Sequence, residues 1–174
     1  NDINLVNVGI ITFIPFIANL FTIFSPLVLE KLIKRKKILA ISRLVYYTLH
    51  ILAVTVMPYF IEDTGLKISI FIALIFAANV INSIFVSGYT AWQSNFLPPQ
   101  VRADFFAYSQ TISAFVGGVV AIALSIAADS LKGSVYEIKV IYAIRYFAYI
   151  LAVIDVIVLS LPKEYEYNKS AKID

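Results

Sequence analysis

The chain has 174 residues, of which 60% are apolar and 14% are charged, and its formal net charge is +3. A soluble domain is about 45–50% apolar and about 25% charged, so this chain has too few polar residues to cover a water-exposed surface. It contains no cysteine and one histidine, which excludes disulfide frameworks, thiolate metal sites and most histidine-based chemistry. We therefore expect neither a metal nor a cofactor.

Five apolar segments follow one another along the chain, and each is long enough to cross a bilayer, which takes about 20 residues per helix. They cover residues 8–29, 38–61, 66–92, 105–128 and 138–161. Polar connectors at 30–37, 62–65, 93–104 and 129–137 separate them, and a polar tail covers 162–174. The segments are too long and too uniformly apolar for β-barrel strands. The sequence predicts an all-α, polytopic membrane helix bundle over residues 1–161, followed by a tail or linker.

Basic residues indicate how these segments are oriented. The connector 30–37 carries a dense cluster of cations, namely Lys31, Lys34, Arg35, Lys36 and Lys37. Short loops rich in lysine and arginine stay on the cytoplasmic side. We therefore expect a multi-pass protein of the cell membrane with this connector, Arg102 and the tail in the cytoplasm. The N-terminus then lies outside, and because the chain begins with Asn1 rather than Met, we expect further sequence upstream.

The basic connector resembles a loop of the major facilitator superfamily of transporters. Between its second and third helices that family has the pattern Gly-x-x-x-Asp-Arg-x-Gly-Arg-Arg, and residues 26–35 read Pro-Leu-Val-Leu-Glu-Lys-Leu-Ile-Lys-Arg. The acid and the bases of the pattern align with Glu30, Lys31, Lys34 and Arg35, whereas Pro26 and Ile33 stand in place of the two glycines.

The connector before the fourth segment carries a second resemblance. In many bacterial members of the family it holds an aromatic residue, then proline, then an arginine that opens the next helix. The corresponding residues are Trp92, Pro98-Pro99 and Arg102, followed by Phe105, Phe106 and Gly117-Gly118. The connector lengths are also similar to those of family helices two to six.

The resemblance implies one six-helix half of such a transporter without its first helix. Members pair two halves of one polypeptide around a midplane cavity and alternate between inward-open and outward-open states. It therefore implies a secondary active transporter, a symporter for a small polar solute coupled to H+ or Na+, with the bilayer and the remaining half as partners. The alternative is a five-helix membrane subunit or scaffold that transports nothing and uses the basic loop as an anchor.

Uncharged polar side chains within the apolar segments are candidate site residues. Asn19, Asn79, Asn82 and Gln110 either join helices through hydrogen bonds or line a cavity that binds a polar solute. At the cytoplasmic loops, Glu30 could pair with Lys31, Lys34, Arg35 or Arg102 in one conformation and release them in the other, as a gate. The bases also have a simpler role as membrane anchors.

Four ionisable groups lie within the apolar segments, namely Arg43, His50, Arg145 and Asp155. A charge at the bilayer centre costs ~2.5–3.5 kcal/mol on insertion scales, so each needs a partner, a cavity or a route to the surface. Arg43 is close enough to the cytoplasmic end to reach it. Arg145 and Asp155 are ~15 Å apart along one helix and cannot pair with each other. His50, near a helix centre, is either the proton-coupling residue or a buried, neutral, hydrogen-bonded side chain.

The sequence contains no signature of an enzyme. It lacks Gly-x-Ser-x-Gly, His-Glu-x-x-His, a phosphate-binding glycine loop and paired intramembrane acids. We therefore expect no enzymatic activity. The basic cluster flanks a membrane segment, so we expect no nucleic-acid partner.

Overall fold

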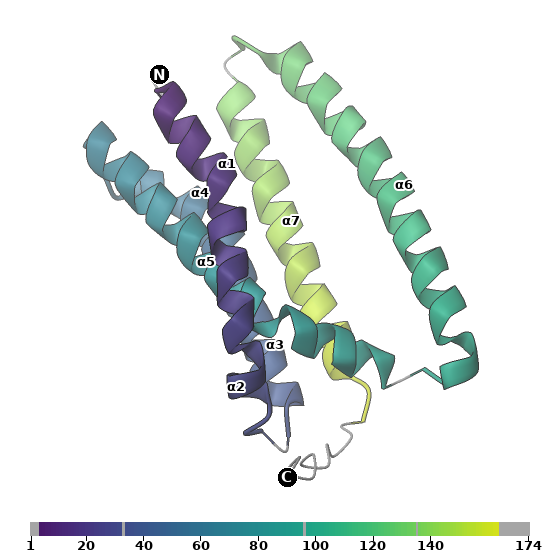
Figure 1. The fold of residues 1–174 in the computed structure, drawn as a ribbon. Helices are drawn as coiled ribbons and strands as arrows, with labels where there is room; N and C mark the ends of the chain where they lie inside the picture. Colours follow the sequence, from purple (N-terminus) through teal and green to yellow (C-terminus); the bar gives the residue numbers. More distant parts are fainter. Residues whose placement is uncertain (1–3, 33, 96, 135, 164–174) are drawn as a thin grey trace.

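The computed structural model describes residues 4–32, 34–95, 97–134 and 136–163, and its regular elements are all helices (Figure 1). Five helical segments are long and apolar enough to cross a membrane: Leu5–Leu29, Lys36–Tyr59, Thr64–Ser94, Pro99–Leu131 and Glu137–Ser160. The expected all-α fold with five such segments is therefore confirmed. Most of the expected tail, residues 164–174, lies outside the described part of the chain.

The first segment changes its helix type before its second proline. It consists of α1 (Leu5–Asn19), a 3-10 turn (Leu20–Phe24) and α2 (Ser25–Leu29). Pro15 lies inside α1 and leaves it continuous, whereas Pro26 lies in the first turn of α2. Because proline has no N–H to donate, the start of a new helical segment is a position that tolerates it.

The second segment contains a wide turn that the sequence did not predict. It consists of α3 (Lys36–Tyr47), a π-helical turn (Thr48–Ala53), α4 (Val54–Val56) and a 3-10 turn (Met57–Tyr59) that contains Pro58. In a π turn the backbone bonds run from i to i+5, so the turn holds more residues than an α turn, and such turns often occur at functional sites. His50 lies within this turn.

The remaining segments are uninterrupted helices, namely α5 (Thr64–Ser94), α6 (Pro99–Leu131) and α7 (Glu137–Ser160). Helix α6 begins earlier than the expected connector 93–104 allows. Pro99 is its first residue, and proline suits that position because its fixed φ matches a helix and the N–H it lacks would have no partner there. The connector is thereby reduced to residues 95–98.

The segments around α5 form the packed part of the molecule, and α6 stands apart from it (Figure 1). One core cluster comprises Leu29, Leu39, Tyr89 and Trp92, and a second comprises Ile14, Val54 and Ile75. No residue of α6 is buried. The first cluster lies at the end of the bundle where the basic connector and Pro162 meet, joined by a hydrogen bond from Lys36 Nζ to the Pro162 carbonyl (2.8 Å). We call this the basic end; which side of a membrane it faces stays a prediction.

Candidate functional site

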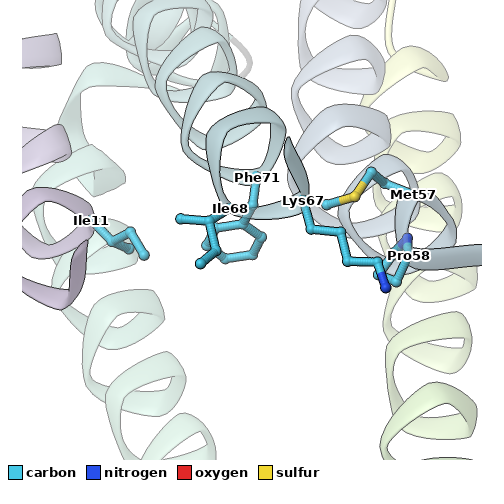
Figure 2. A pocket seen from close by; sticks show the side chains of 6 residues that line it. All are labelled: Ile11, Met57, Pro58, Lys67, Ile68 and Phe71. Carbon is cyan, nitrogen blue, oxygen red and sulfur yellow. The ribbon is translucent and has the colours of Figure 1, made fainter. Parts of the chain in front are cut away.

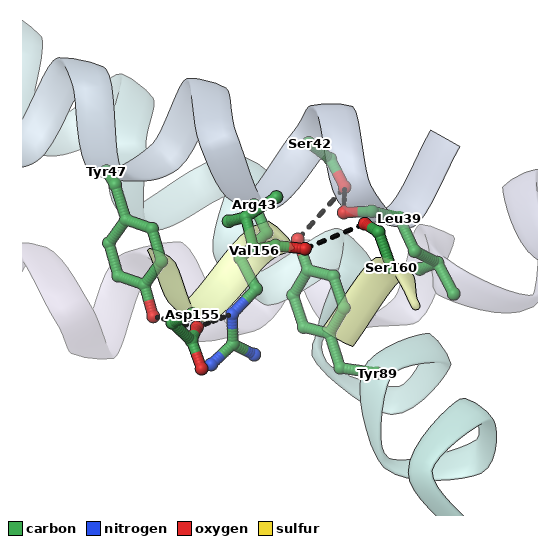
Figure 3. Close-up of polar contacts among 8 residues, drawn as sticks. All are labelled: Leu39, Ser42, Arg43, Tyr47, Tyr89, Asp155, Val156 and Ser160. Atoms are coloured by element: carbon green, nitrogen blue, oxygen red, sulfur yellow. Dashed lines mark hydrogen bonds and ion pairs between the residues drawn. The ribbon is translucent and has the colours of Figure 1, made fainter. Parts of the chain in front are cut away.

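Near the basic end, an ion pair joins α3 to α7 (Figure 3). Arg43 Nε lies 2.9 Å from Asp155 Oδ2, and the side chains of the two residues are 23% and 41% exposed. The Tyr47 hydroxyl donates a second hydrogen bond to the same oxygen at 3.2 Å. Arg43 therefore has one of the expected means of balancing its charge, a carboxylate on the neighbouring helix. That its guanidinium also reaches the membrane surface stays a prediction.

Tyr89, on the third helix α5, packs against the arginine of this ion pair. The Cζ atom of Arg43 lies 5.3 Å from the centroid of the Tyr89 ring and 5.6 Å from the centroid of the Tyr47 ring. The Tyr89 hydroxyl is hydrogen-bonded to Ser42 Oγ at 2.9 Å, and Leu39 beside it is fully buried. Cation–π contacts and buried hydroxyl bonds fix the position of the arginine.

Arg145 lies further along the same pair of helical segments and has different partners. Its Nε donates to Thr55 Oγ1 at 2.6 Å, and its Nη2 donates to the His50 carbonyl at 3.4 Å. Between the two arginines, the Thr48 and Tyr149 hydroxyls are 3.0 Å apart. The second and fifth segments are therefore joined by polar contacts along much of their length.

A cavity of about 420 Å³ opens between α5, α6 and α7. Amide and hydroxyl side chains line it together with apolar ones, namely Thr90, Gln93, Leu97, Phe105, Phe106, Ser109, Gln110 and Leu159. Its volume lies within the range of about 300–1,000 Å³ typical of small-molecule sites. Of the four amide residues expected to bind solute, only Gln110 lies on this cavity.

A second cavity, of about 190 Å³, lies at the opposite end of the bundle and has an apolar lining apart from one amine (Figure 2). Its walls come from α1, the 3-10 turn of Pro58 and the start of α5, with the side chains of Ile11, Met57, Pro58, Lys67, Ile68 and Phe71. It offers few groups that could orient a polar solute, and it is smaller than typical ligand sites. We therefore do not assign the solute to it.

The asparagines that were expected to line a cavity lie along α5 and at the end of α1. Asn19 Oδ1 accepts a hydrogen bond from Ser83 Oγ at 3.4 Å, which joins the first segment to α5. Asn79 Nδ2 donates to the Ile75 carbonyl of its own helix at 2.8 Å, and Asn82 is half-buried. The contact of Asn19 is of the helix-joining kind; solute binding by the three asparagines stays a prediction.

The basic connector and Arg102 are at the same end of the bundle, but the structure does not bring Glu30 to a cation. Glu30, Lys31 and Lys34 are exposed, and Glu30 forms no ion pair with any described residue. Arg102 Nη2 donates to the Leu97 carbonyl at 3.1 Å, which holds the short connector against the first turn of α6. A gating role of Glu30 stays a prediction.

His50 lies at the centre of the second segment, half-buried, with its ring against that of Tyr46 at 5.4 Å between centroids. Its backbone carbonyl, rather than its imidazole, makes the contact with Arg145. A role of the imidazole in proton coupling stays a prediction.

Sequence reasoning missed several residues that the structure brings together, namely Tyr47, Thr48, Thr55, Tyr89 and Tyr149. One signal was available for the ion pair. Arg43 and Asp155 have opposite charges and lie at similar distances from the same end of their segments. Comparing the depths of oppositely charged residues would therefore have predicted that these two form an ion pair. No comparable signal exists for the hydroxyls, because threonine and tyrosine are common throughout the chain.

Within the described residues, no group of three or more His, Asp or Glu side chains is arranged to hold a metal ion. The sequence matches no protein-family model, and neither a curated protein nor a solved structure matches the chain. The resemblance to the transporter superfamily therefore rests on the residues quoted above.

Proposed function

We propose that the chain is part of a multi-pass membrane transporter of the major facilitator type, which moves a small polar solute by alternating access. The observation that carries the proposal is the cavity between α5, α6 and α7. It is large enough for a small solute, and its amide and hydroxyl groups lie on helices that are otherwise apolar enough to cross a membrane. Polar groups at such positions are costly facing lipid, so a polar ligand or water is a suitable occupant.

The lining of the cavity sets the class of solute. Gln93 and Gln110 each offer a donor and an acceptor, and Thr90 and Ser109 offer hydroxyls. None of the lining side chains is charged, and Phe105 and Phe106 supply aromatic surface. An uncharged polar solute such as a sugar, polyol or amide fits this lining.

Two further observations support the proposal. Helix α6 contributes Ser109 and Gln110 to the cavity and buries no residue, as expected of a helix that packs on further helices of a larger assembly. Arg102 and the short connector lie beside the cavity's α6 wall, since Leu97, which accepts the Arg102 hydrogen bond, is part of the lining. A movement of this connector would change access to the cavity from the basic end.

Solute uptake by the native gene product in liposomes, with an imposed proton or sodium gradient, tests the proposal. We expect at least one uncharged polar solute to accumulate, and Gln110→Leu to weaken its apparent affinity by about 3- to 10-fold through the loss of one hydrogen bond. Gln100→Leu is the matched control, because Gln100 is also an exposed glutamine of α6 but does not line the cavity. No accumulation by correctly inserted protein would contradict transport and favour the non-transporting subunit.

The orientation is tested separately by labelling single cysteines with a membrane-impermeant reagent. Lys37→Cys and Glu62→Cys place the thiol at exposed positions on opposite ends of the second segment. We expect labelling of Glu62→Cys from outside intact cells and of Lys37→Cys only after the cells are opened. Labelling of both from the same side would contradict the proposed topology.

A further inference from the structure

Arg145 carries a charge that no described residue neutralises. It lies ~12 Å along α7 from Glu137 and is half-buried. The ion pair formed by the described residues is that of Arg43 with Asp155, and Asp155 lies ~15 Å away along α7. The guanidinium of Arg145 therefore stands within a membrane-length helix without a carboxylate beside it.

The acceptors that Arg145 does have are neutral. Its Nε bonds to the Thr55 hydroxyl and its Nη2 to the His50 carbonyl. The Thr55 hydroxyl donates its single proton to the Ile51 carbonyl at 2.5 Å, so it acts toward Arg145 as an acceptor alone. The other N–H groups of the guanidinium have no hydrogen-bond acceptor among the described residues. Arg145 as a whole residue is half-buried.

The backbone around Arg145 favours this arrangement. The His50 carbonyl belongs to the π-helical turn Thr48–Ala53, and Thr55 follows in α4. Two hydrogen bonds from one guanidinium to two separate positions of this segment, His50 and Thr55, restrain its plane, so the remaining donors are presented in a defined direction. A guanidinium held in this way offers a planar fork that matches the two oxygens of a carboxylate or phosphate.

We propose that Arg145 binds an oxyanion, a carboxylate or phosphate group, where α7 meets the π-helical turn and α4. The anion neutralises the guanidinium and occupies the donors that the protein leaves unused. Arg145 makes the contact with the anion, whereas Thr55 and the His50 carbonyl position the guanidinium. This site is distinct from the cavity of Gln110 and does not rest on the proposed function.

The oxyanion could belong to a soluble ion or to the headgroup of an anionic phospholipid, and the two sources can be separated. The purified chain in neutral detergent is titrated with inorganic phosphate against sodium chloride at equal ionic strength. In parallel, it is placed in nanodiscs of phosphatidylcholine with and without phosphatidylglycerol. Ligand binding to the folded state raises the unfolding midpoint, which circular dichroism follows in both series.

Arg145→Gln removes the charge and keeps a group that can bond to Thr55. Loss of the charge-assisted hydrogen bonds should weaken anion binding by about 10- to 100-fold. Lys139→Gln is the matched control, because it removes the same charge from an exposed position of the same helix. Arg145→Lys keeps the charge and loses the planar fork, so we expect intermediate affinity.

A midpoint raised by phosphate, or by phosphatidylglycerol, in the wild type and Lys139→Gln but not in Arg145→Gln supports the site and identifies its source. No rise with either probe, or an equal rise in Arg145→Gln, overturns the proposal. If Arg145→Gln does not fold, Arg145→Lys decides: an undiminished rise excludes recognition by the fork, and a diminished one supports it. The readout of this experiment is the unfolding midpoint and not solute transport. The result for the anion site is therefore independent of whether the chain belongs to a transporter.

Discussion

The two arginines at the interface of the second and fifth segments differ in how their charge is balanced. Arg43 on α3 has a carboxylate at 2.9 Å and two tyrosine rings against its guanidinium. Arg145 on α7 has a hydroxyl and a backbone carbonyl. The charge of Arg43 is balanced by a carboxylate, whereas the hydrogen-bond acceptors of Arg145 are both uncharged.

The difference separates a stabilising role from a binding role. A charge that is paired within the protein helps to hold two helices together, and its removal leaves the partner charge without compensation. A charge without a partner in a membrane segment does not stabilise the fold, so its presence calls for a function. The following substitutions test this distinction through the free energy of unfolding in mixed micelles.

Asp155→Asn should have the largest effect, a loss of about 2–3 kcal/mol. The substitution leaves the Arg43 guanidinium without its carboxylate, and the loss falls below that of a fully buried pair because both side chains are partly exposed. Asp104→Asn, at an exposed acid of α6, should change stability by less than about 0.5 kcal/mol. Equal losses in the two variants would show that the ion pair contributes nothing specific.

Gly88→Ala should lower the free energy of unfolding by about 1–2 kcal/mol, because it overpacks the contact of α5 with Leu29 and Leu39. A Cβ at Gly88 would lie 2.8 Å from a methyl group of Leu39 and 2.9 Å from one of Leu29. Gly117→Ala is the control, because nothing lies within 4 Å of the added atom there. If Gly88→Ala is as stable as wild type, the contact between α5 and the first two segments is looser than described.

Tyr47→Phe should cost about 1 kcal/mol, since it removes one of the hydrogen bonds that Asp155 accepts and keeps the ring beside Arg43. In the background of Asp155→Asn the same substitution should have a smaller effect, because the two residues share a network. Tyr108→Phe, at an exposed ring, provides the reference. Additive effects of Tyr47→Phe and Asp155→Asn would contradict a shared network.

Arg145→Gln should have the smallest effect, within about 0.5 kcal/mol of wild type in the absence of anions. The substitution removes a charge that no carboxylate balances, and glutamine can still bond to Thr55. Arg43→Gln, the same change in the ion pair with Asp155, should lose about 2 kcal/mol. A large loss in Arg145→Gln alone would reverse the comparison and make Arg145 the structural residue.

The all-α fold and the five long segments could be predicted from the sequence because apolar runs of this length have few alternative structures. Such a run forms a helix because a helix provides a hydrogen-bond partner for its backbone N–H and C=O groups within the same segment. The start of α6 at Pro99 was missed, because Gln100, Arg102 and Asp104 make its first turns polar, and a hydropathy pattern assigns such residues to a connector.

The site was less predictable, because hydropathy marks depth along a helix but not the direction of a side chain around it. Gln110 was found as a polar residue at membrane depth, and it lies on the cavity. The pairing of Arg43 with Asp155 depends on which helices are neighbours. The partners of Arg145 depend on the π-helical turn, which leaves no mark in the apolar pattern of residues 48–53.

The π-helical turn Thr48–Ala53 makes the second segment sensitive to the deletion of a single residue. In an uninterrupted α-helix, residues that lie two turns beyond Tyr47 fall near position 54, whereas the wider turn delays the matching position to Thr55. Val54 is thereby directed into the cluster with Ile14 and Ile75, and Thr55 meets Arg145. Removing one codon from the turn would restore α-helical phase while leaving composition and hydropathy almost unchanged. Such a deletion would rotate Val54 and Thr55 away from their present contacts with the Ile14 cluster and with Arg145. A one-residue gap at this point in an alignment would therefore indicate a change in these contacts rather than a change in loop length.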